Sequence, residues 1–393
     1  MIVGVVKESY PGERRVALTP NVLPGLAKTG VETIVQAGLG LSAGYPDAHY
    51  AEKGARVVES RADVFRSADL VAQVRGYGAN PERGREDLGL LRRGQVLVAT
   101  FEPLTALDQV KAVADRGVTL FALELVPRIT RAQSMDVLSS MATIAGYKAV
   151  LLAASELPRM FPMMMTAAGT VTPARVFVVG AGVAGLQAIA SSRRLGALVH
   201  AYDVRPAVQE EVESLGAKFV ELEIDASASQ DAGGYARDLG DDFYRRQREA
   251  MSRVLVNSDV VITTAVVPGK TAPVLVTADM VRGMPPGSVI VDLAAERGGN
   301  CELTRPGETV TAHGVTILGP INLASTVPFH ASQMFAKNVS TFLLNMIDKE
   351  HKLDLGKDDP IVRESMVVRD GEIVHPRVRE SIGAGAAATR SGA

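Results

Sequence analysis

Ala174-Arg-Val-Phe-Val-Val-Gly180-Ala-Gly182-Val-Ala-Gly185 is the stretch that decides the fold. An apolar strand, Arg175–Val179, runs directly into G-x-G-x-x-G and a helical pattern. Gly180 permits the tight strand-to-helix turn, Gly182 lets the backbone approach a pyrophosphate, and Gly185 brings helix and strand close together. The phosphates would then meet unpaired N–H groups at a helix N-terminus. The stretch predicts a βαβ unit that binds a dinucleotide.

An acidic residue stands at the end of the next strand, Leu198–Asp203. There the Asp203 carboxylate can accept hydrogen bonds from both ribose hydroxyls of the adenosine, and it repels a 2′-phosphate, so NAD(H) is favoured over NADP(H). Arg205 weakens this preference, because an arginine can pair with that phosphate; we expect it over the adenine or on a phosphate. A glycine-rich turn with an incidental aspartate is the alternative, but strand, glycines, helix, strand and acid occur in the required order.

The same alternation of apolar runs and helical patterns extends along the chain. Further strands are predicted at Ile2–Val6, Glu32–Gln36, Leu70–Val74, Val96–Thr100, Thr119–Ala122, Val260–Ala265, Ser288–Leu293 and Val315–Gly319, and helices at Pro20–Thr29, Arg61–Arg66, Leu104–Asp115, Ser134–Glu156, Gly185–Leu195 and Ala331–Ile347. This rhythm is typical of parallel sheets covered by helices. We predict an α/β protein of two Rossmann-like lobes joined by long helices, with a cleft between them. The helix over Ser134–Glu156 either bridges the lobes or is the core helix of one large domain.

Composition excludes several classes of protein. The 393 residues are 47% hydrophobic and 22% charged, which is globular, and the net charge of −2 gives no electrostatic case for nucleic acid. Cys301 is the only cysteine, so a disulfide framework within the chain is impossible. No apolar run approaches the roughly 20 residues that span a bilayer, so we expect a soluble chain that any membrane partner must hold in place.

The usual catalytic groups of a dehydrogenase are missing. Hydride transfer to a carbon substrate commonly needs a general acid or base near neutral pKa, but none of the six histidines has a second titratable group beside it at a suggestive spacing. No metal-binding pattern and no G-x-S-x-G motif occur, so we expect no metal site. Structural roles are the better interpretation for the histidines.

A polar cluster precedes the long helix. In Arg128-Ile-Thr-Arg-Ala-Gln133-Ser134-Met-Asp136, Ser134 is interpreted as an N-cap, with Asp136 adding suitable charge to the first turn. An arginine, an amide and a carboxylate that converge on a cleft can also hold a nicotinamide carboxamide and its ribose without exchanging a proton. We favour this second interpretation for Arg128, Gln133 and Asp136.

Four segments together resemble the NAD(H)-binding alpha subunit of proton-translocating NAD(P) transhydrogenase, over roughly residues 1–380. They are the segment 128–136, the glycine motif 180–185, Tyr202-Asp203-Val-Arg205 and Thr263-Thr-Ala-Val-Val-Pro-Gly-Lys270. The alanine dehydrogenases are broader relatives and share Lys7-Glu8 and Arg14-Arg15-Val-Ala-Leu-Thr-Pro20. The resemblance implies a homodimer whose first lobe is residues 1–138 with 326–380, an NAD(H)-binding lobe over 139–325, and a flexible tail over 381–393.

The resemblance also implies roles for individual residues. It places Arg128, Gln133, Asp136 and Ser139 at the nicotinamide end, with Gln133 spanning two nucleotides, and it places Val183, Asp203, Val204 and Arg205 on the adenosine side. The uneven, polar stretch near 221–245 matches a mobile loop that closes over NAD(H) through Gly234 and Tyr235, with Gln247 and Val266 also along the cofactor.

The second substrate is then NADP(H) on a partner subunit, and a membrane-embedded subunit couples the transfer to proton translocation. The chain would lie on the cytoplasmic face of the inner membrane through these partners, without inserting itself. Direct exchange between two nicotinamides releases no substrate proton, which agrees with the missing acid or base.

Two other functions remain open from the sequence. A soluble alanine-type dehydrogenase resembles this chain, but such enzymes carry a histidine where Glu102 stands and an aspartate where Glu296 stands; Arg15 is either a leftover carboxylate binder or a structural partner. A non-enzymatic NAD(H) sensor is the third hypothesis, which the polar cluster at 128–136 disfavours.

Overall fold

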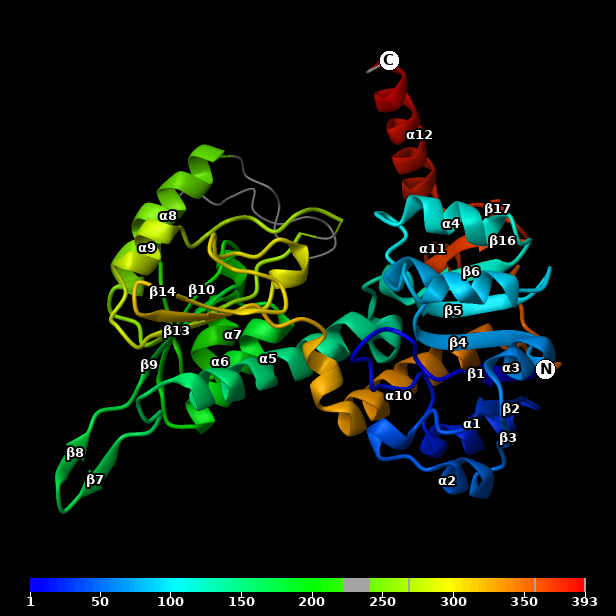
Figure 1. The fold of residues 1–393 in the computed structure, drawn as a ribbon, viewed down its shortest axis with the longest axis horizontal. Helices are drawn as coiled ribbons and strands as arrows, with labels where there is room; N and C mark the ends of the chain where they lie inside the picture. Colours follow the sequence, from blue (N-terminus) through cyan, green and yellow to red (C-terminus); the bar gives the residue numbers. More distant parts are fainter. Residues whose placement is uncertain (222–240, 268, 357, 392–393) are drawn as a thin grey trace. The chain divides into compact units, whose positions relative to one another are not determined.

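The computed structural model describes residues 1–221, 241–267, 269–356 and 358–391 (Figure 1). The chain divides into two compact units: unit 1 is Met1–Met141 with Ser325–Ala393, and unit 2 is Ala142–Ala324. Helix α5 (Val137–Glu156) carries the chain from one unit into the other. Both units are α/β with mainly parallel sheets, which confirms the predicted fold class.

Unit 1 is built on a sheet of eight strands, counted over the described residues, in the order β17-β16-β6-β5-β4-β1-β2-β3. The strands are β1 (Ile2–Val5), β2 (Glu32–Gln36), β3 (Arg56–Val58), β4 (Leu70–Arg75), β5 (Val96–Thr100), β6 (Thr119–Ala122), β16 (Met366–Arg369) and β17 (Glu372–Ile373). Strands β1 to β6 pair in parallel, on the apolar runs that the sequence predicts. Strands β16 and β17 add an antiparallel edge that was not predicted.

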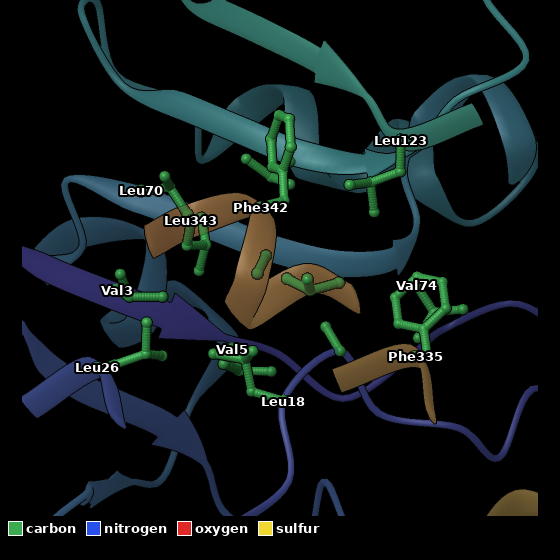
Figure 2. Close-up of a cluster of buried hydrophobic side chains, with 14 of the residues drawn as sticks. Val3, Val5, Leu18, Leu26, Leu70, Val74, Leu123, Phe335, Phe342 and Leu343 are labelled. Atoms are coloured by element: carbon green, nitrogen blue, oxygen red, sulfur yellow. The ribbon is translucent and has the colours of Figure 1, made fainter. Parts of the chain in front are cut away.

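The core of unit 1 joins segments that are far apart in the sequence. Its helices are α1 (Leu23–Ala27), α2 (Asp47–Glu52), α3 (Arg61–Ser67), α4 (Leu107–Ala114), α10 (Pro328–Met346), α11 (Pro360–Ser365) and α12 (Pro376–Ser391). Helix α10 buries Phe335, Phe342 and Leu343 against Val3 and Val5 of β1 (Figure 2). Their spacing places them on one face of the helix, which explains why a segment from near the C-terminus completes the core of the N-terminal sheet.

Unit 2 is built on a seven-stranded sheet in the order β11-β10-β9-β12-β13-β15-β14, again over the described residues. Its strands are β9 (Arg175–Val179), β10 (Leu198–Tyr202), β11 (Lys218–Phe219), β12 (Val260–Thr263), β13 (Val289–Asp292), β14 (Thr309–Ala312) and β15 (Val315–Leu318), and its further helices are α6 (Val183–Arg194), α7 (Gln209–Ser214), α8 (Asp241–Leu255) and α9 (Ala278–Arg282). All pairs are parallel except the edge pair β14–β15. Strands β7 (Met164–Thr166) and β8 (Gly169–Val171) form a separate antiparallel hairpin.

The strand order of unit 2 reverses at β9. The chain proceeds from β9 through β10 to β11 on one side, and then continues with β12 on the other side of β9. Ligands of open parallel sheets bind outside the carboxyl ends of the strands at such a switch point. The fold therefore directs attention to the residues that follow β9, β10 and β12.

Two sequence interpretations are corrected at helix ends. Helix α5 begins at Val137, and Asp136 caps it: the Asp136 carboxylate accepts hydrogen bonds from the Ser139 backbone N–H (2.9 Å) and hydroxyl (2.6 Å). The N-cap is therefore Asp136 and not Ser134, which lies in the preceding 3₁₀ helix. At the other end of the chain, α12 extends through residues 381–391, which the sequence predicts to be a tail.

Helix α5 is the one helix among the described residues that is long and apolar enough to cross a membrane, by length and composition only. Its Ala149, Val150 and Ala153 are fully buried in the hydrophobic core of unit 2. The core helix of a protein in water passes the same test of length and composition.

Candidate dinucleotide-binding site

Three loops meet at the carboxyl edge of the sheet in unit 2. Val179, at the end of β9, is in register with Tyr202 of β10 on one side and with Thr263 of β12 on the other. The residues that follow these three positions are Gly180, Asp203 and Thr264. The sheet register thus brings together the glycine motif, the predicted ribose acceptor and the beginning of the segment that contains Val266.

The glycine loop is built by close packing. Gly180 has a φ of +98°, which glycine adopts without the steric cost of other residues. A Cβ on Gly185 would lie 1.8 Å from the Gly180 carbonyl oxygen, so only glycine allows α6 to approach the turn. Both glycines therefore have the structural tasks that the sequence assigns to them.

The second glycine faces open space. The only neighbour recorded within 4 Å of a Cβ built on Gly182 is the Arg205 Nη2 atom, at 4.0 Å. Gly182 is also the N-cap of α6, and without a side chain it leaves the first-turn N–H groups of that helix uncovered by its own residue. A phosphate needs this combination of space, helix N-terminus and adjacent cation, so the cradle fits the pyrophosphate of a dinucleotide.

Asp203 is held rigidly at the edge of this cradle. Its side chain is almost fully buried, and Oδ2 accepts a hydrogen bond from the Ala181 N–H of the glycine loop at 2.7 Å. The Arg205 guanidinium pairs with both carboxylate oxygens, through Nε and Nη2 at 2.9 Å each. The pKa of Arg205 is raised, first by the hydrogen bond to Asp203 and then by its charge. In this structure Arg205 is thus the counter-ion of Asp203, and its position over the adenine stays a prediction.

The other predicted residues of unit 2 differ in exposure. Val183, the first residue of α6, and Val266 are each about two-fifths exposed, and Val204 is half-buried. Gln247 of α8 is buried, and its Nε2 donates to the Tyr202 hydroxyl at 3.0 Å. Gly234 and Tyr235 lie outside the described residues.

In unit 1 the predicted nicotinamide residues lie on one short segment. Gln133 belongs to the 3₁₀ helix Thr130–Met135, and both Arg128 and Gln133 are exposed. Asp136 and Ser139 are half-buried and hydrogen-bonded to each other as the cap of α5. The two exposed side chains are therefore available at the surface of unit 1, whereas the cap pair fixes the end of the segment.

This segment is tied to the rest of unit 1 by two side chains. Asp359, the N-cap of α11, accepts a bidentate pair of hydrogen bonds from Arg131, at 2.5 and 2.9 Å. Asn338 of α10 donates to the Ser134 carbonyl at 2.9 Å. Arg131 lowers the pKa of Asp359 far below its ordinary range by a direct hydrogen bond. Elements near the C-terminus thus position the segment that carries Gln133.

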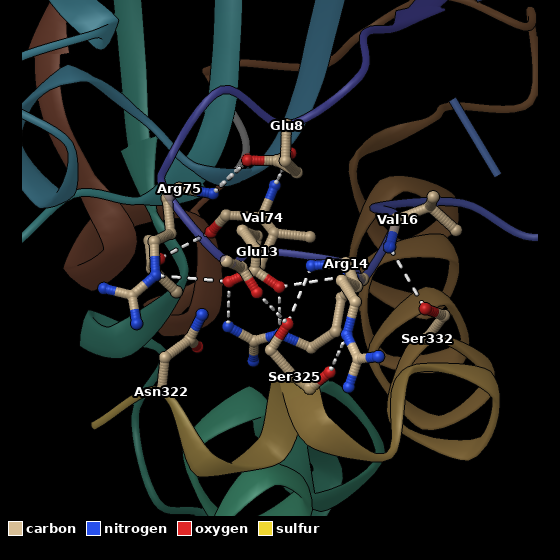
Figure 3. A network of polar contacts seen from close by, with 12 residues as sticks. Glu8, Glu13, Arg14, Val16, Val74, Arg75, Asn322, Ser325 and Ser332 are labelled. Atoms are coloured by element: carbon tan, nitrogen blue, oxygen red, sulfur yellow. Dashed lines mark hydrogen bonds and ion pairs between the residues drawn. The ribbon is translucent and has the colours of Figure 1, made fainter. Parts of the chain in front are cut away.

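A buried ionic network lies near the N-terminus of unit 1 (Figure 3). Glu13 accepts hydrogen bonds from Arg15 Nε and Nη2, at 2.8 and 2.7 Å, and from Arg75 Nε at 3.3 Å. Burial alone raises the pKa of Glu13, but the hydrogen bonds and charge of Arg15, together with the charge of Arg75, outweigh it and lower the pKa to about 2. Arg15 is therefore engaged by a carboxylate of its own chain, which favours the structural role for it.

A second buried carboxyl group supports the loop after β5. Glu124 Oε1 accepts the backbone N–H groups of Phe101 and Glu102, and Glu102 has a φ of +57°. Burial raises the pKa of Glu124 to about 7 against the lowering effect of these hydrogen bonds. Glu124 thus holds the unusual backbone of Glu102 at the position where the alanine dehydrogenases resemble this chain but carry histidine.

We expect the pH dependence of stability to report on Glu124. A carboxyl group whose pKa is raised in the folded state stabilises the fold below its unfolded pKa, near 4.5, and this contribution is lost as the pH rises through about 7. Glu124→Gln should therefore lose less stability than the wild type between pH 5 and pH 8, by on the order of 1–3 kcal/mol. Urea unfolding at the two pH values measures this, and identical losses in both proteins would show that Glu124 does not titrate in this range.

Some residues of this region were not found from the sequence. Thr264 donates to the Gly180 carbonyl at 3.0 Å, and Asn300 pairs with the backbone of Ala265. Both reach the glycine loop through contacts between distant segments, which no local motif encodes. The signal available was Asn300 directly after Gly298 and Gly299, two glycines with positive φ.

Comparison with known proteins gives consistent results over both units. The family models "Alanine dehydrogenase/PNT, N-terminal domain" and "Alanine dehydrogenase/PNT, C-terminal domain" match residues 4–145 and 149–376. The chain is 48% identical over 378 residues to an NAD(P) transhydrogenase subunit alpha chain of Rhodospirillum rubrum, covering 96% of this chain and 98% of that protein.

Solved structures give the same order of similarity. The transhydrogenase from Sinorhizobium meliloti is 42% identical with a TM-score of 0.82, covering 96% of this chain and 99% of that one. An L-alanine dehydrogenase is 26% identical with a TM-score of 0.80, covering 98% and 99%. The two folds are equally similar, but the sequence is much closer to the transhydrogenases. The chain therefore belongs to the alanine dehydrogenase/PNT family and, within it, to the alpha subunits of NAD(P) transhydrogenase.

Proposed function

We propose that this chain binds NAD(H) and supplies one half of an NAD(P) transhydrogenase. Hydride passes directly between NAD(H) and NADP(H) on a partner subunit, and the transfer is coupled to proton translocation across a membrane. The observation that carries the proposal is the cradle of Gly182, the α6 N-terminus and Asp203 at the switch point of unit 2, in a chain that aligns with an alpha subunit over nearly its full length.

In unit 2 the residues bind the adenosine half. The N–H groups at the start of α6 would receive the pyrophosphate, with the Arg205 guanidinium beside Gly182 adding positive charge. Asp203 would accept the ribose hydroxyls, an exchange that draws on its pairing with Arg205. Val183, Val204 and Val266 supply the apolar contacts that a planar adenine or ribose needs.

In unit 1 the residues orient the reactive half. Bound NADH supplies the hydride at its nicotinamide ring. Arg128 and Gln133 would hold the carboxamide and ribose of this end, and the capped pair Asp136 and Ser139 would keep them in place. None of these residues has to gain or lose a proton, because NADH and NADP⁺ become NAD⁺ and NADPH without a proton released at the site.

The competing function is a soluble alanine-type dehydrogenase. Glu102 replaces the histidine of those enzymes, and Glu296 replaces an aspartate and accepts the Asn322 backbone N–H. Arg15, the residue available for a substrate carboxylate, is bidentately paired with Glu13. These three observations disfavour amino-acid chemistry.

One assay separates the hypotheses. The purified chain is given NADH with pyruvate and ammonia, and then NADH with an NADP analogue, with and without an NADP(H)-binding subunit. We expect NADH oxidation only in the presence of the added subunit. Alanine formation by the isolated chain would overturn the proposal, and tight NADH binding with no turnover in any mixture would favour a sensor.

The name alpha subunit implies partner subunits, and we further infer that two copies of this chain associate through the β7–β8 hairpin. Met165 of this hairpin is 80% exposed, and Met163 beside it is 59% exposed. Figure 1 shows the hairpin extending from the seven-stranded sheet of the same unit. A two-stranded hairpin is only marginally stable in water, and exposed methionines favour an adaptable protein contact. A second copy of the chain is the occupant that a homodimer requires.

Met165→Asp should shift the chain from dimer to monomer, because a carboxylate would be buried without a partner in the interface. Sedimentation equilibrium measures the dissociation constant, and we expect it to rise by about 100-fold or more, equivalent to roughly 3 kcal/mol. Val256→Asp, at an exposed valine elsewhere in unit 2, is the control and should leave the dimer intact. A wild-type monomer, or equal effects of both variants, would exclude the hairpin as the dimer contact.

The remaining partners follow from the proposed reaction. A membrane-embedded subunit conducts the proton, and the chain lies at the cytoplasmic face of the inner membrane through that subunit and the NADP(H)-binding one. Fractionation tests this arrangement: the chain should sediment with membranes only when the partner subunits are expressed with it.

A further inference from the structure

We propose that Asn300 is a positioning residue of the dinucleotide site, which fixes the segment 264–267 beside the glycine loop. The inference rests on the proposed function, because that function places NAD(H) along this segment through Val266. Asn300 itself is fully buried and lies at the far end of a long irregular loop after β13.

The side-chain amide of Asn300 pairs with Ala265 as a neighbouring strand would. Asn300 Oδ1 accepts the Ala265 N–H at 2.9 Å, and Nδ2 donates to the Ala265 carbonyl at 2.8 Å. The second Nδ2 proton reaches the Pro273 carbonyl at 2.9 Å. Every donor of the amide is thus used on backbone, and the chain just beyond β12 gains the pairing that the sheet no longer supplies there.

Asn300 is itself held by a buried carboxylate. Asp292, the last residue of β13, is fully buried and accepts the backbone N–H groups of Asn300 and Cys301 at 2.7 and 2.9 Å. The Thr304 and Thr263 hydroxyls also donate to Asp292, at 2.7 and 2.9 Å. The end of β12, the end of β13 and the loop that carries Asn300 therefore share one carboxylate, which leaves the Asn300 amide a single position.

The positioned segment contacts the phosphate cradle directly. Thr264, which precedes Ala265, donates its hydroxyl proton to the Gly180 carbonyl at 3.0 Å, and its N–H donates to the Val179 carbonyl at 2.9 Å. Val266, which follows Ala265, presents an exposed side chain. A hydrogen-bonded chain therefore runs from Asp292 through Asn300 and Ala265 to both sides of the segment. Loss of the amide would release Val266 and loosen the support of Gly180.

Asn300→Ala should weaken NADH binding by about tenfold, because the ordering of the segment is then charged to the binding step. Asn300→Asp keeps the size and the acceptor for the Ala265 N–H but offers no amide protons to the two carbonyls, so it should show a similar loss. Binding is followed by the fluorescence of NADH, and hydrogen exchange of the Ala265 amide is measured in the same proteins without ligand. We expect this amide to be protected in the wild type and to exchange at least about tenfold faster in both variants.

The matched control is Ser288→Ala, at the opposite end of β13. Ser288 is buried and donates to the Ser258 and Pro285 carbonyls, so its loss costs comparable hydrogen bonds in the same unit. NADH affinity and Ala265 exchange should stay at wild-type values in this variant. Wild-type affinity in a folded Asn300 variant, or an equal loss in Ser288→Ala, would overturn the inference.

Two further outcomes remain decisive. If neither Asn300 variant folds, protection of the Ala265 amide in the wild type decides: rapid exchange contradicts positioning by Asn300, and exchange only through global unfolding supports it. If the wild type fails to bind NADH, the proposed function falls, while the exchange comparison still tests the positioning by itself.

Discussion

Gln133→Ala should lower the rate of hydride transfer about 100-fold while NADH affinity changes by less than about threefold. Gln133 is exposed on a 3₁₀ helix that the Arg131–Asp359 pair and Asn338 hold in place. An amide that spans two nucleotides contributes mainly to their relative orientation, which matters in the transition state more than in either binary complex. Single-turnover transfer in the assembled complex gives the rate, and NADH titration of the isolated chain gives the affinity.

The neighbouring residue provides the control for this variant. Ser134 lies on the same 3₁₀ helix, and the recorded tie of that position to α10 is its backbone carbonyl. Ser134→Ala should therefore leave both rate and affinity unchanged. Equal losses of rate and affinity in Gln133→Ala would make Gln133 an ordinary binding residue.

Asp203→Ala should weaken NADH binding by roughly 1–3 kcal/mol, because charge-assisted hydrogen bonds to the ribose are lost. The variant also removes the acceptor of the Ala181 N–H and leaves Arg205 without its carboxylate. NADPH should consequently bind better relative to NADH, since a 2′-phosphate can take the place of the missing charge.

Asp203→Asn separates the two contributions. The amide keeps an oxygen for the Ala181 N–H but not the negative charge, so the glycine loop should remain in place while the preference for NADH falls. Titration with both reduced nucleotides measures the ratio of affinities. An unchanged NADH affinity in Asp203→Ala would remove Asp203 from the site.

Much of the fold could be predicted because parallel strands carry a local signal. A strand buried on both faces is a continuous apolar run, as in β9 (Arg175–Val179), and the order of such runs with helices determines the sheet. Strand β14 (Thr309–Ala312) alternates threonine with small apolar residues, and its pairing with β15 depends on contacts rather than composition. The antiparallel edges were missed for this reason.

The helix cap shows a competition that local reasoning could not decide. Ser134 and Asp136 are both good N-cap residues, and each precedes the apolar pattern of α5. Buried Ala132 and Met135 hold the preceding turn as a 3₁₀ helix, and the cap falls to Asp136. Packing with α10 thus moved the start of the helix by three residues relative to the prediction, from Ser134 to Val137.

The candidate site was predicted as far as its motifs extend. The glycine loop and Asp203 share one βαβ unit, so their spacing in the sequence is their spacing in the fold. Asn300, Asp292 and Glu124 act through hydrogen bonds to backbone atoms of distant segments, and such partners have no sequence signature. The pairing of Arg205 with Asp203 was missed although the two residues are close, because either a ligand or the neighbouring carboxylate can satisfy a guanidinium.

Direct transfer between the two nucleotides is tested by following the hydrogen itself. NADH carrying deuterium at the transferred C4 position is mixed with NADP⁺ in the assembled complex, in ordinary water, and the NADPH formed is analysed by mass spectrometry. Exchange between two nicotinamides predicts that NADPH retains the deuterium at C4. Deuterium lost to water, or found in an organic acid or amino acid, would contradict direct transfer.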